Sequence, residues 1–342
     1  MSTAAEDDTP AGNPFARVLQ TIGKGPGRGR PLTREEARDA FASLLDGRAA
    51  EVQVGAFLLL MRYRGETPDE LAGFIDAART HEGWPALGSG GAIDLDWPSY
   101  ATGPSRGAPW FLLSALLLAR SGLRVLMHGV QPPDNPRGAE AMAATLGLPV
   151  AHTLADAADA IERERFAYLP LRLMSPGLYR LMGLRPLLGL RTPVNSLLKL
   201  VNPLAAPAVI QGVFHPPYLD LHARSAALLG QARSSVFKGG RGEAERNPLK
   251  ATTVRIQQGD GWNDADWPVL VGTGRGERPE PATPEHLLAV WRGEADDPVG
   301  EAAVIGTAAI ALATARPGLT MDEAVETARS LWRGRAGGAQ PG

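Results

Sequence analysis

A basic stretch in the middle of the chain carries the clearest chemical signal in the sequence. No acidic residue lies between Glu164 and Asp220, although six Lys and Arg residues fall in that interval. Residues 161–260 contain 14 Lys and Arg against 6 Asp and Glu, whereas the whole chain of 342 residues has a net charge of −2. A local excess of positive charge attracts a polyanion such as nucleic acid. The stretch therefore predicts a nucleic-acid-binding surface, with a solvated face or a subunit contact as the alternatives.

A glycine-rich segment follows a predicted strand inside this stretch. The segment from Lys238 to Lys250 interleaves cations with three glycines, a combination that suits a mobile clamp on a phosphate backbone. Glu243 and Glu245 leave two alternatives open. They could fold back onto the arginines in a structural turn, or they could hold a divalent ion together with substrate phosphates.

The candidate nucleic-acid-binding residues are the cations of these segments and of a loop rich in Gly and Pro near the N-terminus. They are Arg172, Arg180, Arg185, Lys199, Lys238, Arg241, Arg246 and Lys250, together with Lys24, Arg28 and Arg30. Three aromatic residues, Phe166, Tyr168 and Tyr179, lie among them and could stack on bases, which favours single-stranded DNA. No helix-turn-helix, zinc-finger or RRM motif is present, so the binding is expected to be independent of sequence.

Two other places could hold a small phosphorylated ligand. Ser105 and Arg106 precede a predicted helix and could cradle a phosphate, with an ordinary strand-to-helix turn as the alternative. His128 and Gly129 end a predicted strand, where ligands of open α/β sheets gather. His128 could serve as an acid, a base or a phosphate donor, or it could simply bond to a neighbouring loop.

The composition excludes several classes of site. The chain has no Cys, which excludes disulfides, Cys-ligated metals and thiol nucleophiles. The other five histidines are scattered without ligand spacing, so no metal site and no cofactor are expected. Asp264 and Asp266 are expected in a polar surface turn. No secretory signal opens the chain and no run of about 18 apolar residues occurs, so a cytoplasmic protein is expected.

The pattern of elements changes along the chain. Residues 15–82 form consecutive helices with short connections, and Thr33 with Glu36 has the spacing of a capping box. A second helix start has Thr67 at the N-cap and Pro68 at the first helical position. Beyond residue 90, short apolar strands alternate with helices, which is typical of a parallel α/β sheet. The predicted strands are 92–95, 123–128, 166–170, 209–213, 235–238 and 254–257.

Three segments resemble the anthranilate phosphoribosyltransferase family. Residues 32–79 are similar to its N-terminal helical domain, Met127-His128-Gly129 resembles its Lys-His-Gly strand end, and residues 188–203 resemble its Leu-Gly-Ile-Arg-Thr…Asn-Pro segment. The resemblance implies a nucleoside-phosphorylase-like α/β fold, with a small helical N-terminal domain beside a large α/β domain that has a mostly parallel central sheet. It also implies a homodimer formed through the helical domain. The expected domains are 15–85, joined by a helical part of 171–203, and 90–335, with tails at 1–14 and 336–342.

The family's reactive positions are altered in this chain. Asp96–Tyr100 stands where the family has a glycine-rich pyrophosphate loop, and Met127 replaces its lysine. Ala244-Glu245 replaces the metal-binding Asp-Glu pair, and Arg185-Pro186 replaces an Arg-Arg pair. Each change removes a ligand for phosphate or Mg²⁺ that the transfer reaction needs. Ser105, Arg106, His128, Gly129 and Glu245 are therefore expected to form a vestigial pocket, with no catalytic residue assigned.

The altered positions resemble those of the divergent YbiB-type branch of the family. The segment 238–248 is similar to that branch's own signature. The resemblance implies sequence-independent nucleic-acid binding on a transferase-like scaffold, with no membrane partner. The alternative is a glycosyl or phosphoribosyl transferase with an altered substrate, which would require Mg²⁺.

Overall fold

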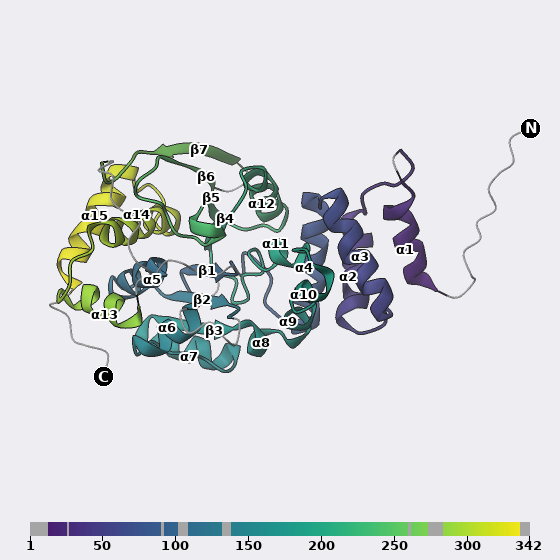
Figure 1. The fold of residues 1–342 in the computed structure, drawn as a ribbon, viewed down its shortest axis with the longest axis horizontal. Helices are drawn as coiled ribbons and strands as arrows, with labels where there is room; N and C mark the ends of the chain where they lie inside the picture. Colours follow the sequence, from purple (N-terminus) through teal and green to yellow (C-terminus); the bar gives the residue numbers. More distant parts are fainter. Residues whose placement is uncertain are drawn as a thin grey trace, which may run out of the picture.

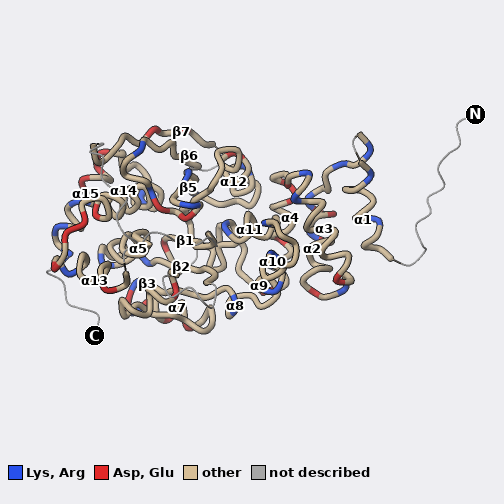
Figure 2. Tube along the Cα trace, in the orientation of Figure 1, with Lys and Arg blue, Asp and Glu red and all other residues tan. Residues whose placement is uncertain are grey.

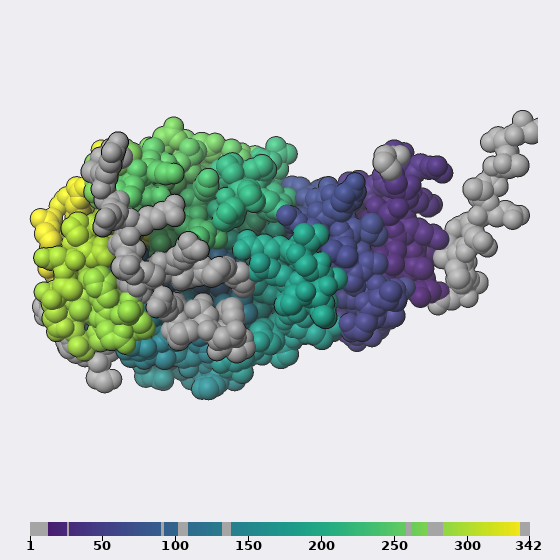
Figure 3. Space-filling model, viewed as in Figure 1, coloured from purple at the N-terminus to yellow at the C-terminus, as the bar shows by residue number. Residues whose placement is uncertain are grey.

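The computed structural model describes residues 13–25, 27–89, 92–101, 109–131, 138–258, 261–272 and 283–335. The chain forms a helical bundle at one end and an α/β domain at the other (Figure 1). In the space-filling view the bundle projects from the larger domain (Figure 3). Ser105 and Arg106 of the predicted phosphate cradle lie outside the described residues.

Four N-terminal helices form the bundle: α1 (Pro14–Gly23), α2 (Arg34–Leu45), α3 (Glu51–Arg64) and α4 (Pro68–Glu82). The capping box of Thr33 and Glu36 is present at the start of α2, as the spacing predicts. Three phenylalanines form the centre of the bundle. The rings of Phe41 and Phe74 stack with centroids 4.9 Å apart, and Phe57 meets Phe74 edge-on at 5.8 Å. Local capping and aromatic packing together fix the bundle.

The basic stretch folds into four short helices that join the bundle to the sheet. They are α8 (Leu171–Met174), α9 (Pro176–Met182), α10 (Arg185–Leu188) and α11 (Val194–Leu197). Their apolar side chains, such as Leu178 and Leu197, belong to the same hydrophobic cluster as Phe41 and Phe74 of the bundle. The apolar residues of the stretch thus face the bundle core, while Arg172 and Arg180 are exposed.

Seven strands form one sheet in the order β3-β2-β1-β4-β5-β6-β7. They are β1 (Leu95–Ser99), β2 (Val125–Gly129), β3 (Phe166–Pro170), β4 (Ala208–Val213), β5 (Arg233–Lys238), β6 (Thr252–Gln258) and β7 (Gly261–Trp267). The first five strands are parallel, and β6 and β7 are antiparallel to their neighbours. The strand order reverses between β1 and β4, which places a crevice at their carboxyl ends.

Two strand predictions are corrected by the structure. The first strand covers 95–99 rather than 92–95, because parallel pairing with β2 and β4 extends the buried segment through Trp97 and Pro98. The polar turn predicted at Asp264 and Asp266 is strand β7. Its outer face is exposed, and Asp264 pairs there with Arg255 of β6. An edge strand with one solvated face can carry charged residues, so its sequence looks as polar as that of a surface turn.

The remaining helices cover the sheet. They are α5 (Trp110–Arg120), α6 (Ala139–Thr145), α7 (Leu154–Glu164), α12 (Pro217–Leu228), α13 (Pro284–Arg292), α14 (Pro298–Ala315) and α15 (Met321–Arg333). By length and composition α14 could cross a membrane, but 72% of that window is buried inside the fold. Its residues, such as Val304 and Ala308, belong to the core cluster of the α/β domain. We therefore assign α14 as a core helix.

Candidate functional site

A cavity of about 90 Å³ lies between the two domains, beside the carboxyl end of β4 and the residue that follows β1. We call it the basic pocket. This is the crevice at the reversal of strand order, where ligands of open α/β sheets bind. Its lining residues are Arg62, Tyr100, Arg191, Thr192, Asn195, Ser196, Lys199, Val213, Phe214, His215, Tyr218 and His222.

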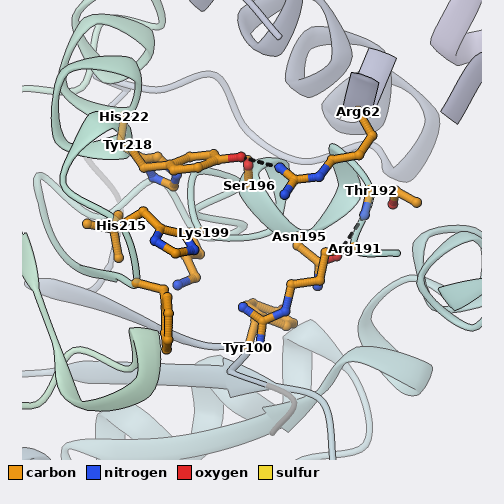
Figure 4. A pocket seen from close by; sticks show the side chains of 12 residues that line it. Arg62, Tyr100, Arg191, Thr192, Asn195, Ser196, Lys199, His215, Tyr218 and His222 are labelled. Carbon is orange, nitrogen blue, oxygen red and sulfur yellow. Dashed lines mark hydrogen bonds between the residues drawn. The ribbon is translucent and has the colours of Figure 1, made fainter. Parts of the chain in front are cut away.

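Three cations enter the basic pocket, one from α3 and two from the residues that flank α11 (Figure 4). Arg62 comes from α3, and its Nη1 donates to the Tyr218 hydroxyl at 2.5 Å. Arg191 precedes α11, and no residue in the described part of the chain is hydrogen-bonded to its guanidinium. Lys199 follows α11, and its Nζ donates to the carbonyls of Gly212 and Gly242. Such a cluster is an anion-binding arrangement.

The cations of the basic pocket are held in an unfavourable electrostatic environment. Burial lowers the pKa of Lys199 to about 8; Glu243 opposes the shift, and Arg191 adds to it. Burial also lowers the pKa of Arg191, and the charges of Arg185 and Arg62 lower it further. A bound anion would relieve this crowding of like charges, because an opposite charge favours the protonated forms.

A buried hydrogen-bonded network lies at the floor of the pocket. The Tyr100 hydroxyl is 2.6 Å from Nδ1 of His128, and Nε2 of His128 is 3.2 Å from the Asp96 carboxylate. Burial raises the pKa of Tyr100 well above its ordinary value. Tyr100 therefore stays protonated, and its O–H donates a hydrogen bond to Nδ1 of His128. The Nε2–H of His128 then donates to the Asp96 carboxylate. The network fixes the Tyr100 ring that lines the cavity.

Two carboxylates accept hydrogen bonds from backbone amides just after β1 and at the start of α5. Glu243 accepts the N–H of Ala101, just after β1, at 2.7 Å. Glu245 accepts the N–H of Phe111, in the first turn of α5, at 3.0 Å. Burial raises the pKa of both groups, to about 8 for Glu245. The amides at the start of α5 would suit a phosphate, and the protein's own carboxylate already holds them.

The residues present do not fit a divalent cation at this position. Glu243 and Glu245 point to different backbone amides, and Ala244 stands between them. Within the described ranges, no group of three or more His, Cys, Asp or Glu residues could hold a metal ion. Mg²⁺ in phosphate sites is commonly bound through one or two carboxylates together with the substrate. The carboxylates here already serve as acceptors in the fold.

Some predicted nucleic-acid contacts lie on the rim of the basic pocket. Lys238 is exposed and pairs in register with Val213, which lines the cavity. Arg241 is exposed and precedes Gly242, whose carbonyl bonds to Lys199. The cations of the loop after α1 lie at the far end of the bundle (Figure 2). That distant group is Lys24, Arg28 and Arg30.

Three other predicted contacts already have partners in the fold, and two more lie elsewhere on the surface. Arg172 pairs with Glu140 at 2.7 Å, and Arg30 pairs with Glu36 at 2.6 Å. Arg180 donates to the carbonyl of Leu44 at 2.7 Å. Arg185 lies beside a second, more apolar groove formed by α9 and α10, and Lys250 is exposed. The basic stretch is thus divided among several surfaces rather than forming one track.

Several predicted positions are corrected because they are buried. Arg246 is 1% exposed, and its guanidinium lies 5.4 Å from the centre of the Trp267 ring, so it cannot contact a nucleic-acid backbone. His128 is fully buried between Asp96 and Tyr100 rather than placed as a phosphate donor. A Cβ at Gly129 would collide with the Ser99 carbonyl, so this glycine serves close strand packing.

The aromatic residues are also reassigned. Phe166 and Tyr168 lie in β3 and are buried, so neither can stack on a base, whereas Tyr179 is 37% exposed. Phe214 at the pocket mouth is 48% exposed and packs edge-on against His215. Phe214 and Arg62 were not anticipated from the sequence. Phe214 directly follows a strand at the sheet's carboxyl edge, a signal that could have identified it. Nothing in the local pattern distinguishes Arg62.

Two regions of the chain match known families. Residues 17–81 match the glycosyl transferase family, helical bundle domain, and residues 111–336 match the glycosyl transferase family, a/b domain. The chain is 30% identical, over 94% of its length and 96% of the relative's, to an anthranilate phosphoribosyltransferase of Nitratidesulfovibrio vulgaris. It is 26% identical, over 72% of its length and 77% of the relative's, to the uncharacterized protein YbiB of Escherichia coli.

Solved structures share the fold. The anthranilate phosphoribosyltransferase of Thermus thermophilus superposes with a TM-score of 0.73 at 24% identity, covering 95% of this chain and 94% of the other. The enzyme of Saccharomyces cerevisiae in complex with PRPP and Mg gives 0.74 at 17% identity, with 94% of each chain covered. The predicted architecture, a small helical domain beside an α/β domain with a mostly parallel sheet, is confirmed.

Proposed function

Because the chain belongs to the glycosyl transferase family with a helical bundle domain and an a/b domain, we propose a function centred on the pocket between those domains. The chain binds nucleic acid through its phosphate groups, without reading base sequence, and does not transfer phosphoribosyl groups. The observation that carries the proposal is the convergence of Arg62, Arg191 and Lys199 on one cavity. A cytoplasmic location, as expected from the sequence, is part of the proposal.

The rim of the basic pocket supports binding of an extended polyanion. Lys238 and Arg241 are exposed beside it, and both belong to the glycine-rich segment. Phe214 offers an exposed ring next to these cations. Single-stranded nucleic acids bind to such combinations of a positively charged groove and aromatic platforms.

The position of Glu245 argues against phosphoribosyl transfer. Its carboxylate accepts the Phe111 amide at the start of α5. In a protein that binds pyrophosphate at a helix N-terminus, these amides must face the ligand. With Glu245 already accepting the Phe111 amide, a phosphate at this position would lack that donor.

Fluorescence anisotropy with a labelled single-stranded DNA of arbitrary sequence that carries a terminal phosphate tests the proposal. We expect binding that weakens with salt, with a slope of log K against log salt of about −0.7 per phosphate contact. The double variant Arg62→Gln/Arg191→Gln should reduce the affinity at least tenfold. Arg329→Gln, on the exposed face of α15, is the matched control and should leave the affinity unchanged. Absence of binding at low salt, or binding insensitive to salt, would contradict the proposal.

A transferase is the second candidate. The observation that favours it is the 30% identity to a relative named as an anthranilate phosphoribosyltransferase, over nearly the full length of both chains. Incubation with anthranilate, phosphoribosyl pyrophosphate and Mg²⁺, followed by loss of anthranilate fluorescence, measures that reaction. We expect no turnover above a protein-free control, and catalytic turnover would overturn our assignment.

A further inference from the structure

We propose that the basic pocket takes a terminal phosphate group, a phosphomonoester, rather than a phosphodiester within a strand. The inference deepens the proposed function and rests on it, because the phosphate would end a nucleotide or a nucleic-acid strand. It draws on three features of the pocket: its donors, its shape and its charge.

The donors left over in the basic pocket exceed those that one bridging phosphate needs. Two of the three N–H groups of Lys199 are used by carbonyls, which leaves one. Arg191 has five N–H groups and no hydrogen-bonding partner among the residues described. Oδ1 of Asn195 accepts the Thr192 N–H at 3.2 Å, so its amide nitrogen remains as a donor. These donors converge on a group with several acceptor oxygens.

The shape of the cavity suits the end of a molecule. Its volume of about 90 Å³ is smaller than the cavity of about 150 Å³ that admits benzene, so it suits a compact group. Arg62, Lys199 and Arg191 line it and approach its interior from different directions (Figure 4). A bridging phosphodiester carries a nucleoside on each side, and both must be accommodated beside the cavity. A terminal phosphate carries only one such substituent.

The charge of the cavity also fits a dianion. Three cations line it, and the carboxylate that acts on both Lys199 and Arg191 is Glu243, which does not line the cavity and accepts the Ala101 N–H. Glu66 accepts the Ser196 hydroxyl at 2.7 Å and is not among the lining residues. A phosphomonoester carries about −1.5 to −2 at pH 7, whereas a phosphodiester carries a single negative charge. The monoester therefore balances more of the positive charge.

Paired oligonucleotides of one sequence separate this inference from the proposed function. A labelled strand is compared with a 5′-phosphate, with a 3′-phosphate and with hydroxyl groups at both ends, and thymidine monophosphate and inorganic phosphate are used as competitors. We expect at least one phosphorylated strand to bind about tenfold more tightly than the unphosphorylated strand, because charge-assisted hydrogen bonds are added. Competition by thymidine monophosphate identifies a free nucleotide as a further source of the same group.

The Arg191→Gln variant assigns the effect to the basic pocket. It should remove the preference for a phosphorylated end while rim contacts retain residual binding, and Arg329→Gln should keep the full preference. An unchanged thermal midpoint for Arg191→Gln excludes misfolding as the cause. Equal binding of all three strands would overturn the inference and leave the proposed function standing. Binding of thymidine monophosphate with no strand binding would overturn the proposed function while supporting a terminal-phosphate pocket.

Discussion

Lys199 shows how burial changes the role of a single residue. In sequence it is one cation of a basic stretch, whereas in the fold its ammonium group is fixed by the carbonyls of Gly212 and Gly242. That fixed position directs its remaining N–H to the basic pocket. The same burial lowers its pKa to about 8, close to neutral pH.

We expect affinity for a phosphorylated ligand to fall as the pH rises through about 8. Lys199 loses its charge there, and a bound anion raises its pKa, so binding near pH 8 takes up a proton. Glu245, with a pKa of about 8, ionises over the same range and adds negative charge. Isothermal titration calorimetry in buffers of different ionisation enthalpy measures the uptake. Lys199→Met should bind more weakly and keep only the part of the pH dependence that belongs to Glu245. A wild-type affinity that is constant from neutral to alkaline pH would contradict this expectation.

The raised pKa of Glu245 predicts that folding stability depends on pH. Its pKa is raised from 4.5 to about 8 in the folded protein, so the folded state binds more protons between those values. The stability it contributes is present below about pH 4.5 and is lost as the pH rises through about 8. Glu245→Gln keeps an acceptor for the Phe111 amide and removes the ionisation. We expect the thermal midpoint of this variant, relative to that of the wild type, to increase as the pH rises from about 5 to about 8.

The control for Glu245 is a glutamate on an exposed helix face. Glu35→Gln in α2 changes the charge equally, and its midpoint should follow the wild type at every pH. Parallel midpoints for Glu245→Gln and wild type would show that the carboxylate is not held in a raised-pKa state.

At the scale of elements, β1 and β2 are joined by the network of Asp96, His128 and Tyr100. All three side chains are buried, so each polar atom depends on its neighbours in the network. His128 is therefore a structural residue that holds the pocket floor in place.

We expect His128→Ala to lower the free energy of unfolding by about 3 kcal/mol, since it leaves a buried carboxylate and hydroxyl without a partner. Tyr100→Phe removes only the hydroxyl and should cost about 1–2 kcal/mol. Urea unfolding measures both values. A small loss for His128→Ala, with a large loss of ligand affinity, would instead mark His128 as a ligand-contacting residue.

At the scale of the whole molecule, the bundle presents an apolar face to solvent. Val52 and Tyr63 of α3 are 79% and 92% exposed and lie 11 residues apart, which places them on one side of the helix. Leu187 of α10 is 84% exposed, and its neighbour Leu188 lies 3.7 Å from the Cβ position of Gly55 in α3. Such a patch is typical of an interface.

We expect two copies of the chain to associate through this face of α3, which retains the homodimer expected from the sequence. Light scattering after size exclusion measures the mass. Val52→Asp/Tyr63→Asp should give a monomer, because burying two carboxylates without partners opposes association. Leu228→Asp, on exposed α12, is the control and should leave the mass unchanged. A monomeric wild type at micromolar concentration would contradict the expectation.

The sequence by itself determined the local features of this protein. The capping box of Thr33 and Glu36, the helices of the bundle and most buried strands were predictable, because they depend on neighbours within a few residues. The excess of positive charge in 161–260 was equally visible. A helical part within 171–203 was expected, but the bounds of α8 to α11 were not, since helices of four to seven residues have too little periodicity to be placed from sequence.

Only the tertiary structure decided which cations share a site. Arg62 and Arg191 are 129 residues apart in the chain and line the same cavity, whereas Arg246, next to the predicted clamp, is buried against Trp267. Periodicity places a residue on an element, but long-range packing of apolar faces places one element beside another. The chemistry of the basic pocket was therefore present in the sequence as residue types, and the fold supplied their convergence.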